Sequence, residues 1–364
     1  MHNKYKKGWL IRTLVVLITL HCSLNANSGS IGATKVCELK DNKKAAYTFT
    51  TDDGVVSAIQ SYNVDFKRLN LRGSMALVAG WISDKSPSNW NFWNKIIADG
   101  HFDVTNHSMT HIYFDKLGSS ATGLDSLNNE INGAQVLLKS KLSGQDMITM
   151  ANPYIINSGS ADELIKQHHF AARNGTIGYN TLNPTDEDWY RLNFQNTFNR
   201  SKLRATYPTE LNNCLDYAIK NRKWLIILAH GIGKNRGEMV QDSITSHFEY
   251  VASKLDSVWC GTFNELTKYI REKQHISIAI KKNSSTRLVL SVTHNLDTKI
   301  FNFPLTLKTQ VSPNWKTVRV IQNNISQTLT PKVENGNRYL YYDVQPNGGN
   351  ITLVKYQISS SCRY

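Results

Sequence analysis

YTFTTDDGVV, residues 47–56, is a β-prone run of aromatic and β-branched residues that stops at two aspartates and a glycine. We predict a strand that ends at Asp52 and Asp53. Two carboxylates side by side at a strand end that lines a cleft repel each other. This repulsion raises the pKa of one carboxyl group unless a cation neutralises the other. The pair therefore predicts a bound metal ion, provided that the chain supplies further ligands.

Further ligands are offered by TNHSMTH, residues 105–111, at the end of the strand-like FDVTN. His107 and His111 lie four positions apart, so on a helical turn both imidazoles would share one face. Two histidines and one carboxylate, with coordination positions left for water and substrate, suit a catalytic divalent metal. The sequence therefore predicts a metal site formed by His107, His111 and one carboxylate of the Asp52–Asp53 pair.

Two other histidine stretches need to be weighed. His168 and His169, in QHHF, lie in a predicted helix and are expected to pack or to face solvent. His230 follows the apolar, strand-like WLIILA. Its position alone allows two interpretations, a core histidine with satisfied hydrogen bonds or a residue of the site, and both stay open.

The middle of the chain alternates strand-like and helix-like segments, which predicts an α/β architecture over residues 40–274. Many of the strand-like segments end in polar residues, and in a barrel such ends gather on one face and form the active site. From about residue 276 helical periodicity disappears, and apolar and polar residues alternate between turns. We therefore expect a small all-β accessory domain of the sandwich type over residues 276–358.

The first 26 residues have a basic start, a short apolar stretch and a polar end with small residues, which is typical of a secretory signal peptide. Cleavage near Ala26 would give an exported protein, secreted or periplasmic. An uncleaved anchor is disfavoured because the apolar stretch is short for a membrane span. Lipid attachment at Cys22 is disfavoured by His21, where a small residue is expected. No other segment of the sequence predicts a stable membrane span.

The net charge is +14, and four of the basic residues lie in the predicted signal peptide, which leaves about +10. Lysines and arginines are scattered without dense clusters, so a solvated basic surface is favoured and nucleic-acid binding is not expected. Outside the signal peptide the cysteines are Cys37, Cys214, Cys260 and Cys362. They form no CxxC pattern, and their pairing cannot be read from the sequence.

The motifs TTDDG, HSMTH, NPY, DW and LAH follow one another in this order between residues 45 and 274. In order and spacing they resemble the NodB-homology polysaccharide deacetylases, carbohydrate esterase family four. The resemblance implies a distorted (β/α) barrel with a divalent metal at its mouth. It also implies removal of N- or O-linked acetyl groups from an acetylated carbohydrate.

The resemblance also implies a role for each motif residue. Asp52 corresponds to the general base, Tyr154 to the residue whose backbone N–H binds the oxyanion, and His230 to the general acid. The metal ligands would be Asp53, His107 and His111, with Ser108 steadying the loop of the two histidines. Zn²⁺ is the first expectation for the metal, and Co²⁺, Ni²⁺ and Mn²⁺ are alternatives.

Two motifs depart from the family pattern. The third usually opens with an arginine that braces the base, but this chain has Ala151. Either another basic residue, such as Arg72 or Arg173, substitutes for it, or Asp52 is held less well. The fourth, PTDEDW, offers Asp186 or Asp188 as an acidic partner for His230.

The first departure motivates an alternative, a non-catalytic carbohydrate-binding protein on a degenerate barrel. Survival of base, ligands and acid together favours an enzyme. N-acetylglucosamine polymers, peptidoglycan and acetylated xylan all remain candidate substrates. The aromatic residues that can line a sugar cleft are Trp81, Trp90, Trp189 and Tyr154.

Overall fold

The computed structural model describes residues 30–356 except 87, 119, 156–158, 198–206 and 234–237. The predicted signal peptide and Cys362 lie outside the described residues. A parallel sheet forms the centre of the larger part of the chain, in the order β6-β5-β4-β3-β2-β8-β7, with β9 beside β2. Its strands are β2 (Ala45–Thr51), β3 (Gly73–Leu77), β4 (Phe102–Asn106), β5 (Thr149–Ala151), β6 (Ala171–Arg173), β7 (Gln195–Asn196), β8 (Trp224–Ala229) and β9 (Val258–Cys260).

Backbone hydrogen bonds join the two ends of this sheet. Leu192 N–H donates to Ala172 O over 3.0 Å, and Phe194 N–H donates to Thr176 O over 3.1 Å. Phe194 directly precedes β7, so the segment after β6 pairs with the segment before β7. The sheet is thereby closed into an irregular barrel, and the predicted distorted (β/α) barrel is confirmed.

Helices surround the sheet: α1 (Val56–Leu69), α2 (Trp90–Ala98), α3 (Ala121–Asn128), α4 (Ala134–Lys141), α5 (Gly159–His168), α6 (Tyr207–Asn221), α7 (Gln241–Ser253) and α8 (Phe263–Gln274). Several of them begin or end where the sequence supplies a cap. Asn89 caps α2, Thr262 and Glu265 form a capping box on α8, and α1 ends at Asn70 in the left-handed conformation. Short turns of helix, η1 (Lys40–Asn42), η2 (Ala79–Trp81), η3 (Phe114–Lys116), η5 (Pro153–Ile155) and η6 (Asp188–Tyr190), lie in the connections.

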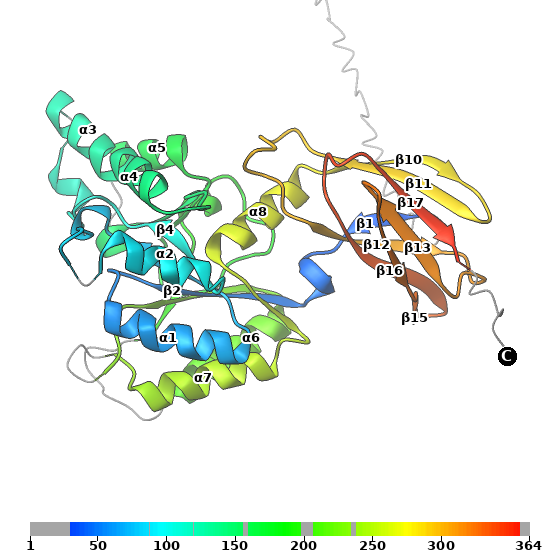
Figure 1. The fold of residues 1–364 in the computed structure, drawn as a ribbon, viewed down its shortest axis with the longest axis horizontal. Coiled ribbons are helices and arrows are strands. Elements are labelled where there is room, and N and C mark those ends of the chain that lie inside the picture. The colour runs from blue at the N-terminus through cyan, green and yellow to red at the C-terminus, as the bar shows by residue number, and fades with distance from the viewer. Residues whose placement is uncertain are drawn as a thin grey trace, which may run out of the picture.

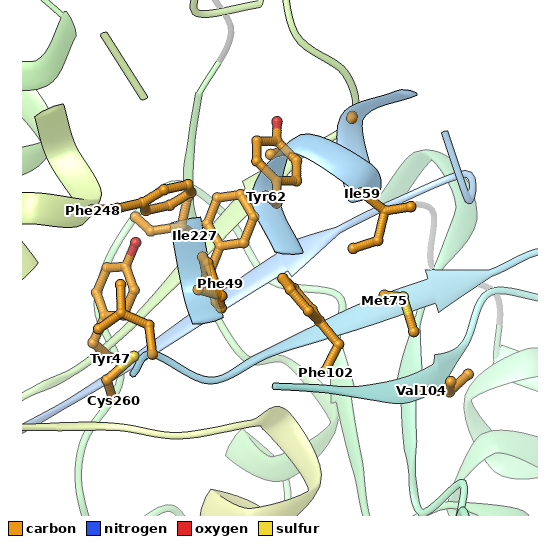
Figure 2. Packing of buried hydrophobic residues seen from close by; sticks show 14 of the residues in the cluster. Tyr47, Phe49, Ile59, Tyr62, Met75, Phe102, Val104, Ile227, Phe248 and Cys260 are labelled. Carbon is orange, nitrogen blue, oxygen red and sulfur yellow. The ribbon is translucent and has the colours of Figure 1, made fainter. Parts of the chain in front are cut away.

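β2 is buried along its whole length, as expected for a central parallel strand. Its threonines satisfy their hydroxyls on neighbouring backbone, for example Thr50 Oγ1 on Ile227 O over 2.7 Å. Figure 2 shows Phe49 of β2 next to Tyr62 of α1 and Phe248 of α7, with both ring centroids 5.0 Å away in edge-to-face contacts. Each such pair adds about 0.5–1.5 kcal/mol beyond the burial of its rings, so this cluster holds the strand that carries the aspartates.

The antiparallel part of the fold combines the C-terminal strands with β1 from the N-terminal end of the described chain. One sheet has the order β1-β12-β16-β15 and the other β10-β11-β17-β13-β14. The strands are β1 (Thr34–Val36), β10 (Ser277–Asn283), β11 (Arg287–Thr293), β12 (Leu305–Val311), β13 (Val318–Gln322), β14 (Ile325–Leu329), β15 (Lys332–Glu334), β16 (Asn337–Val344) and β17 (Asn350–Lys355). Apolar residues of both sheets share one buried cluster, which agrees with the alternating pattern of the sequence.

The two parts of the fold meet along α8, which leads from the barrel into the antiparallel sheets (Figure 1). Tyr269 and Trp259 of the barrel contact Phe303, with ring centroids 6.4 and 5.7 Å away. Tyr269 also donates its hydroxyl to Cys37 O. In the described residues no helix combines the length and the apolar character that a membrane crossing requires.

Candidate active site

The two aspartates lie where β2 ends, beside β8. The register pairs Thr51 with Ala229, and Asp52 N–H donates to Ala229 O over 2.8 Å, which brings Asp52 next to His230. The Asp52 side chain is buried. Asp53 has a φ of 69°, in the left-handed region, so the chain turns sharply and the two carboxylates point into different surroundings.

His107 and His111 come from the loop after β4, with ring centroids 4.8 Å apart. The predicted helical turn is wrong for this stretch: Ser108 and His111 have φ values of 69° and 61°, and the loop doubles back instead of continuing as a helix. Two left-handed residues bring the imidazoles together here, where the sequence pattern suggested helical spacing.

Asp53, His107 and His111 form a group that can hold a metal ion, because one ligand atom from each lies within 4.8 Å of the others. It is the only such group among the described residues. Asp53 Oδ1 lies 3.5 Å from His107 Nε2 and 3.4 Å from His111 Nε2. Within the described chain, the buried atoms Asp53 Oδ1 and His107 Nε2 have no hydrogen-bond partner. A cation between them would satisfy both atoms, so the residues fit a metal.

The backbone carbonyl of Ala151 fixes the orientation of the His107 ring. Its Nδ1 lies 2.6 Å from Ala151 O, a carbonyl that can only accept, so Nδ1 carries the proton. When the ring is neutral, Nε2 then keeps a lone pair directed at Asp53, which is the tautomer that a metal ligand needs. Ala151 thus contributes its backbone where the family pattern has an arginine side chain.

Arg173, at the end of β6, braces Asp52. Its Nη2 donates to Asp52 Oδ1 over 2.7 Å and also contacts Oδ2, and the arginine is completely buried. Arg72, the other candidate, pairs with Glu265 and Gly100 O instead. An arginine from the neighbouring strand end therefore takes the position left open by Ala151.

His230 has an acidic partner that the sequence analysis missed. Its Nδ1 lies 3.2 Å from Glu238 Oε1, and Thr197 Oγ1 donates to Glu238 Oε2 over 2.7 Å. Glu238 is buried. The proposed partners Asp186 and Asp188 are wrong, because both are exposed and Asp188 instead accepts from the N–H of Thr185. Glu238 follows β8 outside any motif, so no local pattern marks it.

The ionisation of the site follows from these contacts. Burial would raise the pKa of Asp53, but the nearby imidazoles, His107 first, outweigh it and lower the pKa to about 2. Burial and the neighbouring His107 lower the pKa of His111, which favours a neutral ligand. Burial would lower the pKa of His230, but the bond to Glu238 and the charges of Asp52 and Asp53 raise it.

These residues line one pocket of about 600 Å³. Its further lining residues are Trp81, Asn152, Tyr154, Ile155, Leu228 and Glu238. Trp81 and Tyr154 are exposed, and each lies against the His111 ring, with centroids 5.4 and 4.5 Å away. The aromatics Trp90 and Trp189 lie in the core instead.

His168 and His169 lie outside this pocket. His169 is buried and its Nε2 contacts Asn106 Nδ2 over 3.1 Å, which agrees with the expected packing role. Several residues at the site have left-handed backbone, which persists where the surrounding structure holds it. The residues concerned are Asp53, Ser108, His111, Tyr154 and Ile155.

No family model matches the sequence. A curated gellan lyase from Bacillus sp is 23% identical over 349 residues; the match covers 89% of this chain, which spans only 13% of that protein. Three solved structures resemble the chain. A chitin deacetylase from Colletotrichum lindemuthianum is 15% identical with a TM-score of 0.44, and the match covers 65% of this chain and 92% of that one. A peptidoglycan deacetylase from Bacillus subtilis is 14% identical with a TM-score of 0.42, and the match covers 65% of this chain and 95% of that one. A family 4 carbohydrate esterase from Streptomyces lividans is 15% identical with a TM-score of 0.40, and the match covers 60% of this chain and 92% of that one. The three structures are named as polysaccharide deacetylases or as a family 4 carbohydrate esterase, the group that the sequence motifs resemble.

Proposed function

We propose that this protein is a metal-dependent deacetylase that hydrolyses N- or O-linked acetyl groups of a carbohydrate polymer or oligosaccharide. One observation carries the proposal. A single pocket contains three potential metal ligands, a carboxylate braced by Arg173 and a histidine paired with Glu238. These are the chemical groups that metal-assisted hydrolysis of an acyl group requires.

Asp53, His107 and His111 would hold the metal, with Zn²⁺ as the first expectation and Co²⁺, Ni²⁺ or Mn²⁺ as alternatives. Three protein ligands of this kind leave coordination positions for water and substrate. When bound, such a cation polarises the acetyl carbonyl and lowers the pKa of a water molecule.

The chain's own residues move the protons. Asp52 accepts a proton from the attacking water, and Arg173 keeps its carboxylate oriented. The N–H of Tyr154 donates to the oxyanion that develops at the acetyl carbonyl oxygen as water attacks its carbon. His230, with Nδ1 bound to Glu238, donates a proton to the departing sugar amine or hydroxyl, so that acetate and the free sugar group are released.

The alternative, a carbohydrate-binding protein on a degenerate barrel, rested on the arginine that Ala151 lacks. Arg173 supplies a guanidinium to the same carboxylate, which removes the reason for that alternative. Trp81 and Tyr154 would then serve substrate binding in an enzyme, since exposed aromatic faces suit sugar rings.

Acetate release with and without added Zn²⁺ or Co²⁺ tests the proposal. The substrate panel comprises chitooligosaccharides, peptidoglycan, acetylated xylan and gellan, the last because the curated relative is named for it. We expect metal-dependent acetate release from at least one of them, and none from His107→Ala or His111→Ala. Release by the histidine variants equal to that of the wild-type protein would contradict the proposal.

We also propose that the protein is exported, on the basis of its first 26 residues. A mature N-terminus near residue 27 in protein collected outside the cytoplasm would support export. Retention of the complete N-terminal segment in the cytoplasm would contradict it.

A further inference from the structure

The loop that carries His107 and His111 accepts two backbone hydrogen bonds from η2 through its carbonyl groups. Ala79 N–H donates to Ser108 O over 3.0 Å, and Gly80 N–H donates to Met109 O over 2.8 Å. A Cβ atom at Gly80 would lie 2.6 Å from Met109 O, so this close approach requires glycine. The loop is therefore fixed to the neighbouring strand end by its backbone.

On the N–H side, one carboxylate holds the residues between the two histidines. Glu130 Oε2 accepts from Met109 N–H over 3.1 Å and from Thr110 N–H over 2.9 Å. Its Oε1 accepts from Thr110 Oγ1 over 2.6 Å. The backbone carbonyl of Glu130 also accepts from Met109 N–H, and the residue is buried. Such bonds to an ionised acceptor are stronger than neutral ones.

Glu130 points at the loop because of an irregular turn. Residues Asn129–Gly133 form a π-helical turn, η4, between α3 and α4. A π-turn inserts one residue into a helix and re-aims its side chains, and it is frequent near functional sites. The same turn also contacts the start of the loop, since Asn106 Nδ2 donates to Ile131 O over 2.8 Å.

The loop needs this support because two of its residues have left-handed backbone. Ser108 and His111 have φ values of 69° and 61°. Such residues persist only where surrounding contacts over-determine them. The histidine spacing that brings Nε2 of His111 within 3.4 Å of Asp53 depends on this backbone, because the loop is not a helix.

We propose that Glu130 is a positioning residue for the metal site, a role that rests on the proposed function. It touches neither metal nor substrate, and it acts through the peptide groups of Met109 and Thr110. Without its carboxylate, Thr110 N–H loses its acceptor, and Met109 N–H keeps only the backbone carbonyl of Glu130. The loop then relaxes away from the geometry in which both imidazoles face Asp53.

Co²⁺ affinity tests the role, read from the visible absorption of bound Co²⁺ and from competition with a chelator, on the full chain. We expect Glu130→Ala to weaken Co²⁺ binding by about 10–100-fold, the usual effect of removing a residue that orients a metal ligand. Glu130→Gln retains one acceptor oxygen, so its Co²⁺ affinity should fall less than that of Glu130→Ala. Thr110→Val removes only the bond from Thr110 Oγ1 to Glu130 Oε1, and its Co²⁺ affinity should fall several-fold.

Glu265→Gln is the matched control. Glu265 is also a largely buried glutamate that accepts from backbone N–H, at the start of α8, and it pairs with Arg72. This variant should lower the melting temperature and leave Co²⁺ affinity unchanged.

Two failures are distinguishable. A wild-type protein that binds no Co²⁺ would overturn the metal site itself and with it the proposed function. Wild-type binding with undiminished affinity in Glu130→Ala would overturn only the positioning role. If Glu130→Ala does not fold, Thr110→Val decides. A Co²⁺ affinity of Thr110→Val equal to that of the wild-type protein would contradict the role. A loss of Co²⁺ affinity in Glu265→Gln as large as that in Thr110→Val would contradict it as well.

Discussion

Asp52 and Asp53 are sequence neighbours with different surroundings. Asp52 is bound by Arg173, whereas Asp53 faces the two imidazoles. We expect Asp53→Asn to lose metal affinity and to regain part of its activity in excess metal, because a charged ligand is removed. Asp52→Asn should retain its metal while turnover falls by about 10²–10⁴-fold, as for loss of a general base.

Metal content, melting temperature and acetate release on both variants measure this division of roles. Excess metal should not rescue Asp52→Asn. If the two aspartates only cap a turn, both variants lose stability and neither loses turnover selectively. Equal metal loss in the two variants would refute the assignment of Asp53 as ligand and Asp52 as base.

Glu238 gives a second prediction at the level of single residues. Its bond to His230 Nδ1 favours the protonated imidazole and raises the pKa of His230 against the effect of burial. Glu238→Gln removes this charge, so the alkaline limb of the pH–activity profile should move to lower pH. Turnover should fall less than in His230→Ala. Asp188→Asn, at the exposed position first considered as the partner, is the control and should leave the profile unchanged.

At the scale of elements, α7 packs on β2 and α6 through a buried histidine. His247 Nε2 lies 3.0 Å from Tyr47 Oη, and Nδ1 lies 2.7 Å from Asn212 Oδ1. The amide oxygen can only accept, so Nδ1 carries the proton and the neutral ring is satisfied on both sides. Burial accordingly lowers the pKa of His247 to about 3.

This contact predicts acid sensitivity. In the unfolded chain the histidine pKa is about 6.5, so between pH 6.5 and 3 the unfolded state binds a proton that the folded state does not. The contribution of His247 to stability is complete above pH 6.5. It decreases as the pH falls, by at most about 1.4 kcal/mol per pH unit. We expect the free energy of unfolding in urea to decrease less between pH 7.5 and pH 4.5 for His247→Gln than for the wild-type protein. An equal decrease in the two proteins would contradict the prediction.

At the scale of the whole molecule, the proposed metal ligands and the antiparallel sheets lie at opposite ends of the barrel. β2 starts beside the antiparallel sheets and runs away from them to the aspartates (Figure 1). We therefore expect a chain that ends after Gln274 to keep Co²⁺ binding. It should melt at a lower temperature, because Trp259 and Tyr269 lose their contacts with Phe303.

Co²⁺ titration and thermal melting of the shortened chain measure both effects. In the full chain, Phe303→Ser should lower the melting temperature without changing metal affinity. Loss of metal binding in a folded shortened chain would show that the predicted division into two domains is wrong.

The barrel and most residues of the candidate site could be predicted from the sequence, because the site residues directly follow strands. The carboxyl ends of parallel strands meet on one face, so motifs that end β2, β4 and β8 had to converge once the α/β alternation was recognised. The change from helical to alternating periodicity near residue 276 likewise predicted the antiparallel sheets. Local patterns sufficed in these cases because they reflect which face of each element is buried.

The supporting residues depended on packing between distant segments. Arg173 lies 121 residues from Asp52, and the sequence does not distinguish it from Arg72 as the bracing arginine. The strand order, which places β6 beside β5, brings Arg173 to Asp52. Glu238 lies only eight residues from His230, but no periodicity or motif of the sequence marks it as the partner. The sequence position of a charged residue does not indicate which residue it will pair with. Pairing is chosen when burial makes an unpaired charge too costly, and burial is a property of the folded chain.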